Sequence, residues 1–176
     1  GLMTASRELP PPDELVARMR AEGVGALFLF HALMDMSLSP WAIDDLLAEL
    51  EGARVPTFIS PDRSRERGKG DIMDWDAVAR ICRDFPELPV IATEPRNMTH
   101  QRTAYAALEA APNLRLDLAP LWRAGMIEFV CEHWGAERLL FSAGLPARDP
   151  AATKMQLDWS AIGEDELAKI AGGNLR

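Results

Sequence analysis

The sequence predicts an α/β domain built around a parallel β-sheet. Short apolar runs that are typical of buried strands begin at Ala26, Val55, Val90, Leu114 and Leu139. Each run is followed by a stretch that places apolar residues at helical spacing. Strands that alternate with helices at intervals of this length indicate βαβ units, in which neighbouring strands run parallel.

The first units have clear boundaries. A helix is expected from about residue 10, and Gly23 ends it. The run at 25–30 is wholly apolar, as in a strand that is buried on both faces. Ser39 is a suitable N-cap for the next helix, because Pro40 then occupies its first turn.

The remaining elements continue the alternation. Strands are predicted at 55–60, 88–93, 113–119 and 138–142, and helices at 74–84, 101–111, 124–134 and 158–171. Asp74 is expected to cap the first of these helices. Cys82 and Cys131 fall on the apolar faces of two helices, so both thiols are expected in the core rather than in a metal site.

Composition limits the classes of partner. The 176 residues are 48% hydrophobic and 26% charged, which fits one globular domain over 1–176. The formal charge of −8 disfavours nucleic acid and anionic membranes as partners. No apolar run reaches the length of a membrane span, and no signal-peptide pattern is present, so a cytoplasmic protein is expected.

Residue spacing leaves two architectures open. One is an open doubly wound sheet, and the other is part of a (β/α)8 barrel, whose complete form needs roughly 250 residues. Neither G-x-G-x-x-G nor G-x-x-x-x-G-K-[ST] follows a predicted strand. The usual nucleotide-binding signatures of open sheets are therefore missing.

Three segments carry a resemblance to a known family. They are GARVPTFISPD at 52–62, FPELPVIATEP at 85–95, and WGAERLLFSAGLP at 134–146 with the closing GGNLR at 172–176. They resemble the fifth, sixth and eighth strand segments of the amidohydrolase superfamily, in its amidohydrolase-related branch of metal-dependent hydrolases and decarboxylases. The resemblance implies a TIM-type (β/α)8 barrel, of which this chain would hold about the last five βα units. The domain would then be an incomplete, N-terminally truncated barrel.

The resemblance also implies a divalent, zinc-like metal that histidines and an aspartate hold at the strand ends, where bound water becomes the nucleophile. The matching positions are altered in this sequence. Ser60 stands at the fifth-strand position, Glu94 at the sixth and Gly144 at the eighth. We therefore expect no standard metal centre or other cofactor in this chain as given, and a zinc-like metal only if a longer parent protein is active.

Polar residues near the predicted strand ends form a candidate non-standard site. His31, Glu94 and Asp117 are the candidate catalytic groups, because acid–base chemistry needs titratable side chains at the barrel mouth. Arg96 would hold an acidic substrate group, and Trp122 would lie near it. More ordinary roles stay open, namely a hydrogen-bonded structural His31 and a surface Glu94–Arg96 ion pair. The other tryptophans are expected in the core.

Three functions follow from these observations. The first is an amidohydrolase-like protein that lacks a standard metal centre and acts as a binding or scaffolding relative. The second is an active hydrolase or decarboxylase on small carboxylated or cyclic compounds, using the non-standard site. The third is a non-enzymatic domain that self-associates as a homo-oligomer, because an incomplete barrel leaves open sheet edges.

Overall fold

The computed structural model describes residues 2–4, 10–31, 36–61, 73–93, 101–119, 124–143 and 149–175. Six strands form one sheet in the order β1-β2-β3-β4-β5-β6, and every neighbouring pair is parallel. They are β1 (Leu2–Thr4), β2 (Ala26–Phe30), β3 (Thr57–Ser60), β4 (Val90–Ala92), β5 (Leu114–Asp117) and β6 (Leu139–Leu140). The predicted α/β class with a parallel sheet is confirmed.

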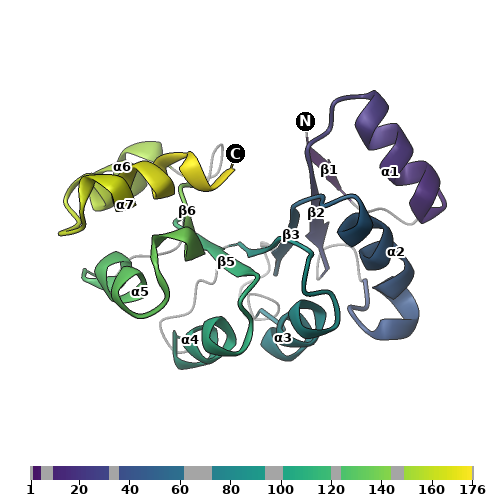
Figure 1. The fold of residues 1–176 in the computed structure, drawn as a ribbon, viewed down its shortest axis with the longest axis horizontal. Coiled ribbons are helices and arrows are strands. Elements are labelled where there is room, and N and C mark those ends of the chain that lie inside the picture. The colour runs from purple at the N-terminus through teal and green to yellow at the C-terminus, as the bar shows by residue number, and fades with distance from the viewer. Residues whose placement is uncertain are drawn as a thin grey trace.

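Helices follow the strands along the chain and lie outside the arc that the strands form (Figure 1). They are α1 (Pro12–Ala21), α2 (Pro40–Gly52), α3 (Trp75–Asp84), α4 (Gln101–Ala110), α5 (Met126–Trp134), α6 (Pro150–Asp158) and α7 (Glu164–Ala171), with short 3-10 helices at Ala136–Arg138 and Gly173–Leu175. None of the helices in the described ranges is long and apolar enough to cross a membrane.

The structure adds one strand to the five that were predicted. β1 pairs with β2, with Leu2 opposite Ala26 and Thr4 opposite Phe28. Three residues are too few to show a periodic pattern, so local sequence gives little sign of β1.

The predicted helix at 158–171 ends at Ala171 as predicted but begins too early, because α7 starts at Glu164 and a separate helix, α6, precedes it. α6 ends at Asp158, and α7 begins at Glu164. α6 begins at a proper cap, since the Asp149 side chain accepts a hydrogen bond from the backbone N–H of Ala151 at 2.9 Å. Pro150 occupies its first turn. An acidic cap followed by proline is a strong start signal for a helix, and α6 was nevertheless not among the predicted helices.

The sheet has two faces of different character. The outer face packs against the helices in one hydrophobic core, to which each of the strands β2 to β6 contributes. Eight apolar strand residues on this outer face are at most 1% exposed: Leu27, Leu29, Ile59, Val90, Ala92, Leu114, Leu116 and Leu139. The alternate residues form the inner face, on which the rings of Phe28 and Phe58 stack with centroids 4.5 Å apart. Phe28, Phe30 and Phe58 are only half-buried.

The family-like motif at 134–140 has a structural role that its residues explain. Gly135 ends α5 with a φ of +91°, where a side chain would be strained and would collide with Glu137. Arg138 is 9% exposed and donates hydrogen bonds to the carbonyls of Leu108, Ala111 and Leu114 at 2.9, 2.6 and 2.7 Å. One buried guanidinium therefore fixes the end of α4 to the start of β5.

The closing GGNLR segment has a similar role. The Asn174 side-chain amide donates to the carbonyls of Ala136 and Leu139 at 2.9 and 2.8 Å. It thereby ties the end of the chain to the start of β6. The residues that carry the resemblance at this end of the chain thus satisfy backbone carbonyls, which is a structural requirement of the fold.

The thiols lie where they were predicted, and the tryptophans only partly do. Cys82 and Cys131 are buried. Trp75 is 7% exposed, but Trp41 and Trp159 are 84% and 77% exposed, so the core prediction is wrong for both. Trp41 precedes the buried Ile43 by two residues, which is roughly 200° around a helix. Trp159 follows the last residue of α6.

Candidate functional site

Three buried polar residues line the carboxyl ends of three neighbouring strands. Ser60, Thr93 and Asp117 are 4%, 3% and 5% exposed and lie at the ends of β3, β4 and β5. The N–H of Thr93 donates to the carbonyl of Ile59 at 2.9 Å, which extends the β3–β4 ladder by one residue. We call Ser60, Thr93 and Asp117 the polar row.

The polar row belongs to the inner face of the sheet. Ile91 pairs with Phe58 on one side and with Arg115 on the other, so all three share the face of the phenylalanine stack. Thr93 and Asp117 each lie two residues further along their strands and therefore point the same way. The carboxyl ends of parallel strands are where barrel proteins bind ligands, so the polar row is the candidate site.

The polar row offers two hydroxyl groups and one carboxylate. Ser60 and Asp117 both have interaction partners within the molecule. Hydroxyl groups can donate or accept hydrogen bonds, and an ionised carboxylate accepts them. The arrangement can therefore orient a small polar compound.

The donor set of the polar row does not suit a zinc-like ion. Such ions are held by imidazole, thiolate and carboxylate groups, of which the polar row contains only the Asp117 carboxylate. No group of three histidine, cysteine, aspartate or glutamate side chains is placed to hold a metal within the described ranges. The altered positions Glu94 and Gly144 lie outside these ranges.

His31 follows β2 and lies on the helix side of the sheet. It lines a cavity of about 380 Å³ at the N-terminal ends of α2 and α3, together with Ser39, Asp74 and Arg80. Asp117 lies on the inner face, so the structure does not bring His31 and Asp117 into one site. The catalytic roles assigned to them stay predictions.

Burial favours the neutral form of the His31 ring. Its Nε2 atom is buried and has no hydrogen-bond partner within the described part of the chain. Burial lowers the pKa of His31, and the nearby Asp74 carboxylate only partly opposes this shift.

The cationic side chain of the His31 cavity is already paired. Arg80 forms a salt bridge to Asp44 and donates to the carbonyl of Leu38 at 2.7 Å. The Asp74 side chain accepts from the N–H of Ala77 at 3.0 Å and caps α3, as predicted. Ser39 occupies the N-cap of α2 as predicted, but its side chain makes no cap hydrogen bond. These contacts serve the packing of α2 against α3.

Several predicted site residues cannot be placed. Glu94, Arg96 and Trp122 lie outside the described residues, and their roles stay predictions. Thr93 is the member of the polar row that sequence reasoning missed. Alternation along β4 gives the signal, because Val90 and Ala92 face the helices and Ile91 and Thr93 therefore face inward.

Comparison with known proteins shows likeness in structure. No family model matches the chain, and no curated protein matches it. An uncharacterized TIM-barrel protein from Bordetella bronchiseptica superposes with a TM-score of 0.74 at 20% identity, over 99% of this chain and 64% of that chain. The 5-carboxyvanillate decarboxylase of Sphingomonas paucimobilis gives a TM-score of 0.72 at 16% identity, over 99% and 64%.

A third structure extends the likeness to a metal-containing protein. The dihydroxybenzoic acid decarboxylase of a Polaromonas species, with bound manganese, gives a TM-score of 0.62 at 14% identity, over 93% of this chain and 63% of that chain. At these identities the comparisons show the fold alone, which is that of part of a TIM barrel. It spans less than two thirds of the length of the first two structures. The expected TIM-type architecture, present as an incomplete barrel, is confirmed.

Proposed function

We propose that this chain is an amidohydrolase-like protein that binds a small polar compound at the barrel mouth without a metal such as the manganese bound in the Polaromonas decarboxylase. The observation that carries the proposal is the polar row, in which Ser60 and Thr93 present hydroxyl groups at strand ends beside a single carboxylate. Hydroxyl groups are weak ligands for zinc-like ions but good partners for a ligand's polar groups. Binding through hydrogen bonds is the use that this set of groups supports best.

Burial supports the binding role. Each member of the polar row is at most 5% exposed, so the hydrogen bonds that it makes are shielded from water. A ligand that replaced one of the present partners would have to match its polarity, because an unpaired buried polar group costs about 1–3 kcal/mol. Selectivity would then come from matching hydrogen bonds.

Metal analysis tests the proposal. The chain is purified from cultures supplemented with zinc and manganese, and its metal content is measured by mass spectrometry beside that of Asp117→Asn. We expect a small fraction of one metal ion per chain for both proteins. One ion per chain in the original protein, lost in Asp117→Asn, would replace this proposal with a metal-dependent hydrolase or decarboxylase.

Self-association is a second candidate function, and the inner face favours it. Phe28, Phe30 and Phe58 are only half-buried, although they stack against one another. Adjoining apolar rings that stay partly exposed on a sheet face are typical of a surface that contacts another protein. A second copy of the chain would cover these rings.

Sedimentation velocity tests self-association. We expect a concentration-dependent dimer that Phe58→Ser weakens. Phe129→Ser is the matched control, because Phe129 is 37% exposed on α5, which lies on the helix side of the sheet. A monomer at all concentrations, or equal weakening by both substitutions, would refute the role of the inner face.

A further inference from the structure

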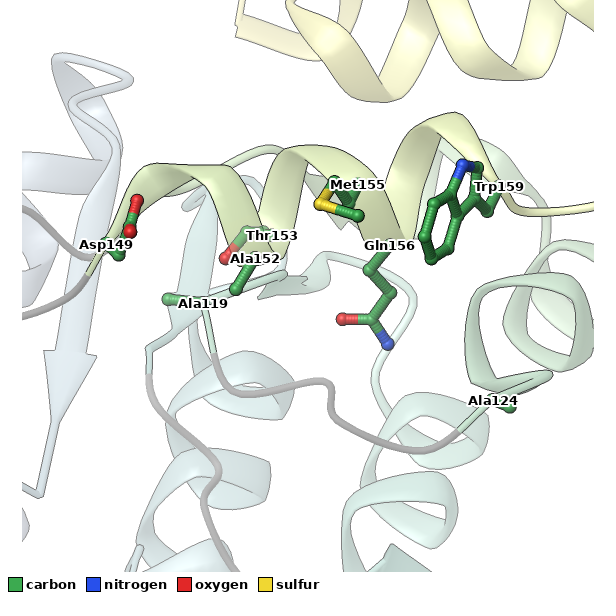
Figure 2. Close-up of a pocket in the computed structure, with 8 residues that line it drawn as sticks. All are labelled: Ala119, Ala124, Asp149, Ala152, Thr153, Met155, Gln156 and Trp159. Carbon is green, nitrogen blue, oxygen red and sulfur yellow. The ribbon is translucent and has the colours of Figure 1, made fainter.

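We propose that a cavity beneath α6 binds a small aromatic compound that carries a hydrogen-bond donor and is neutral or cationic. The cavity has a volume of about 650 Å³, within the range of small-molecule sites. It lies between α6 and the segments on either side of 120–123 in the chain, represented by Ala119 and Ala124 (Figure 2).

The walls of the cavity suit an aromatic ring. Ala119, Ala124 and Ala152 supply small apolar surfaces, and Met155 adds a polarisable thioether. Trp159 lies at one end of α6, and its ring is 77% exposed (Figure 2). An exposed indole at the rim of an apolar cavity offers a face on which a planar or cationic ligand can stack.

Thr153 gives the cavity a polar group. Its side chain is 6% exposed and lines the cavity. Figure 2 shows Thr153 on the side of α6 that faces Ala119. A hydroxyl on an otherwise largely apolar wall can donate or accept a hydrogen bond, so it favours a ligand whose polar group meets it there.

Asp149 sets the expected charge of the ligand. It lies at the opposite end of α6 from Trp159 (Figure 2), and its Oδ1 caps the helix through the N–H of Ala151. A carboxylate has two acceptor oxygens, so the second can accept a hydrogen bond from a ligand. Among the described residues that line the cavity, Asp149 is the charged one, so an amine or another donor is favoured over a carboxylate.

This inference is independent of the polar row. It uses a different set of residues and requires neither a metal nor its absence. It also assigns a ligand of a different class from the carboxylated compounds that the sequence resemblance suggests. A metal found in the purified protein would leave the binding result unchanged.

The test compares two probes of matched shape and opposite charge. 2-Phenylethylamine and 3-phenylpropionate are titrated separately, and the indole N–H signals of the five tryptophans are followed by ¹H–¹⁵N NMR. We expect the amine to shift the Trp159 signal with a dissociation constant of the order of 1 mM, as ligand efficiency allows for so small a probe. The propionate should bind about threefold more weakly or worse, as expected for one exposed charge.

Variants assign the effect to individual residues. Asp149→Asn keeps a good N-cap while removing the charge, so it should weaken amine binding about threefold. Thr153→Val keeps the shape and removes the hydroxyl, so it should weaken binding about fivefold. Trp159→Leu identifies the reporting signal, and Trp41→Leu, on a tryptophan that is 84% exposed on α2, should change nothing.

Each outcome decides the proposal. Tighter or equal binding of the propionate overturns the charge assignment, and no shift of the Trp159 signal with either probe overturns the site. If urea unfolding shows that Thr153→Val does not fold, the variants at the exposed positions Asp149 and Trp159 still test whether the amine binds in this cavity. Equal effects of Trp159→Leu and Trp41→Leu on amine binding would show that the probe binds elsewhere.

Discussion

The two faces of the sheet differ in what they are made of and in what they do. The outer face is mainly apolar, with residues such as Leu29 and Ile59 fully buried against the helices and Thr57 buried among them. The inner face carries half-buried phenylalanines and, at its carboxyl end, the polar row of Ser60, Thr93 and Asp117. The outer face therefore supplies the stability of the fold, and the inner face holds the groups that can meet a ligand.

Chemistry-bearing residues on the helix side serve the structure. Arg138 satisfies three carbonyls, and Cys82 fills the core. The Nε2 atom of His31 is buried beside α2 and α3, and burial lowers the pKa of the ring. The presence of such residue types on the helix side is therefore no evidence of an active site there.

The largest effect is expected at Arg138. Arg138→Ala leaves the carbonyls of Leu108, Ala111 and Leu114 without their donor, so it should lower the free energy of unfolding by about 4 kcal/mol. Arg115→Ala is the control, because Arg115 donates to only one carbonyl, that of Glu137 at 3.1 Å. Urea unfolding measures both. Equal losses in the two variants would contradict the structural role given to Arg138.

A smaller loss of stability is expected from a substitution in the core on the outer face of the sheet. Leu29→Ala should cost about 3 kcal/mol, because Leu29 is 0% exposed and its removal leaves a cavity. Phe30→Ala, at the next position on the inner face, should cost less although the side chain is larger, since Phe30 is only half-buried. Unfolding by urea checks the order. A greater loss for Phe30→Ala would mean that the inner face also holds the core together.

The pH dependence of stability tests the state of His31. Because burial lowers its pKa in the folded chain, the unfolded chain binds the proton first as the pH falls. Folded stability should therefore decline below about pH 6.5, the ordinary pKa of histidine. His31→Gln should lose less stability than the original protein between pH 7.5 and 5, by an amount smaller than the losses above. If the stability of both proteins falls equally between pH 7.5 and 5, the folded chain does not disfavour protonation of His31.

The cysteines should give the smallest effect. Burial raises the pKa of Cys82 to about 12, and burial together with nearby glutamates raises that of Cys131 to about 11. Both thiols should react slowly with a disulfide reagent at pH 8 in the folded protein and rapidly in urea. Rapid reaction of either thiol before unfolding would place it outside the core.

Sequence reasoning worked where local pattern decides the structure. Alternating strands and helices follow from apolar periodicity, and the Asp74 cap follows from residue type. Patterns failed where one element is very short, as in β1, or where two helices adjoin, as at α6 and α7. Trp41 was expected in the core because it is hydrophobic. It is exposed because it lies on the side of α2 that faces away from the core.

The site was predicted only in part, because it depends on how strands align. Ser60 and Asp117 were singled out at strand ends, and they lie in the polar row. Thr93 joins them through the register between β3 and β4, which no single segment contains. His31 ends a strand as predicted, but the cavity that it lines lies on the helix side. For His31, the position at the end of a strand was predictable and the face was not.

Zinc titration of the metal-free protein tests the central claim most directly. The protein is treated with a chelator, and zinc is added in competition with a chromophoric chelator of micromolar affinity. We expect the chromophoric chelator to take the zinc as though no protein were present, because the polar row offers one carboxylate and two hydroxyls. Binding of one zinc per chain below micromolar concentration, abolished by Asp117→Asn, would contradict the claim that this barrel mouth works without a metal.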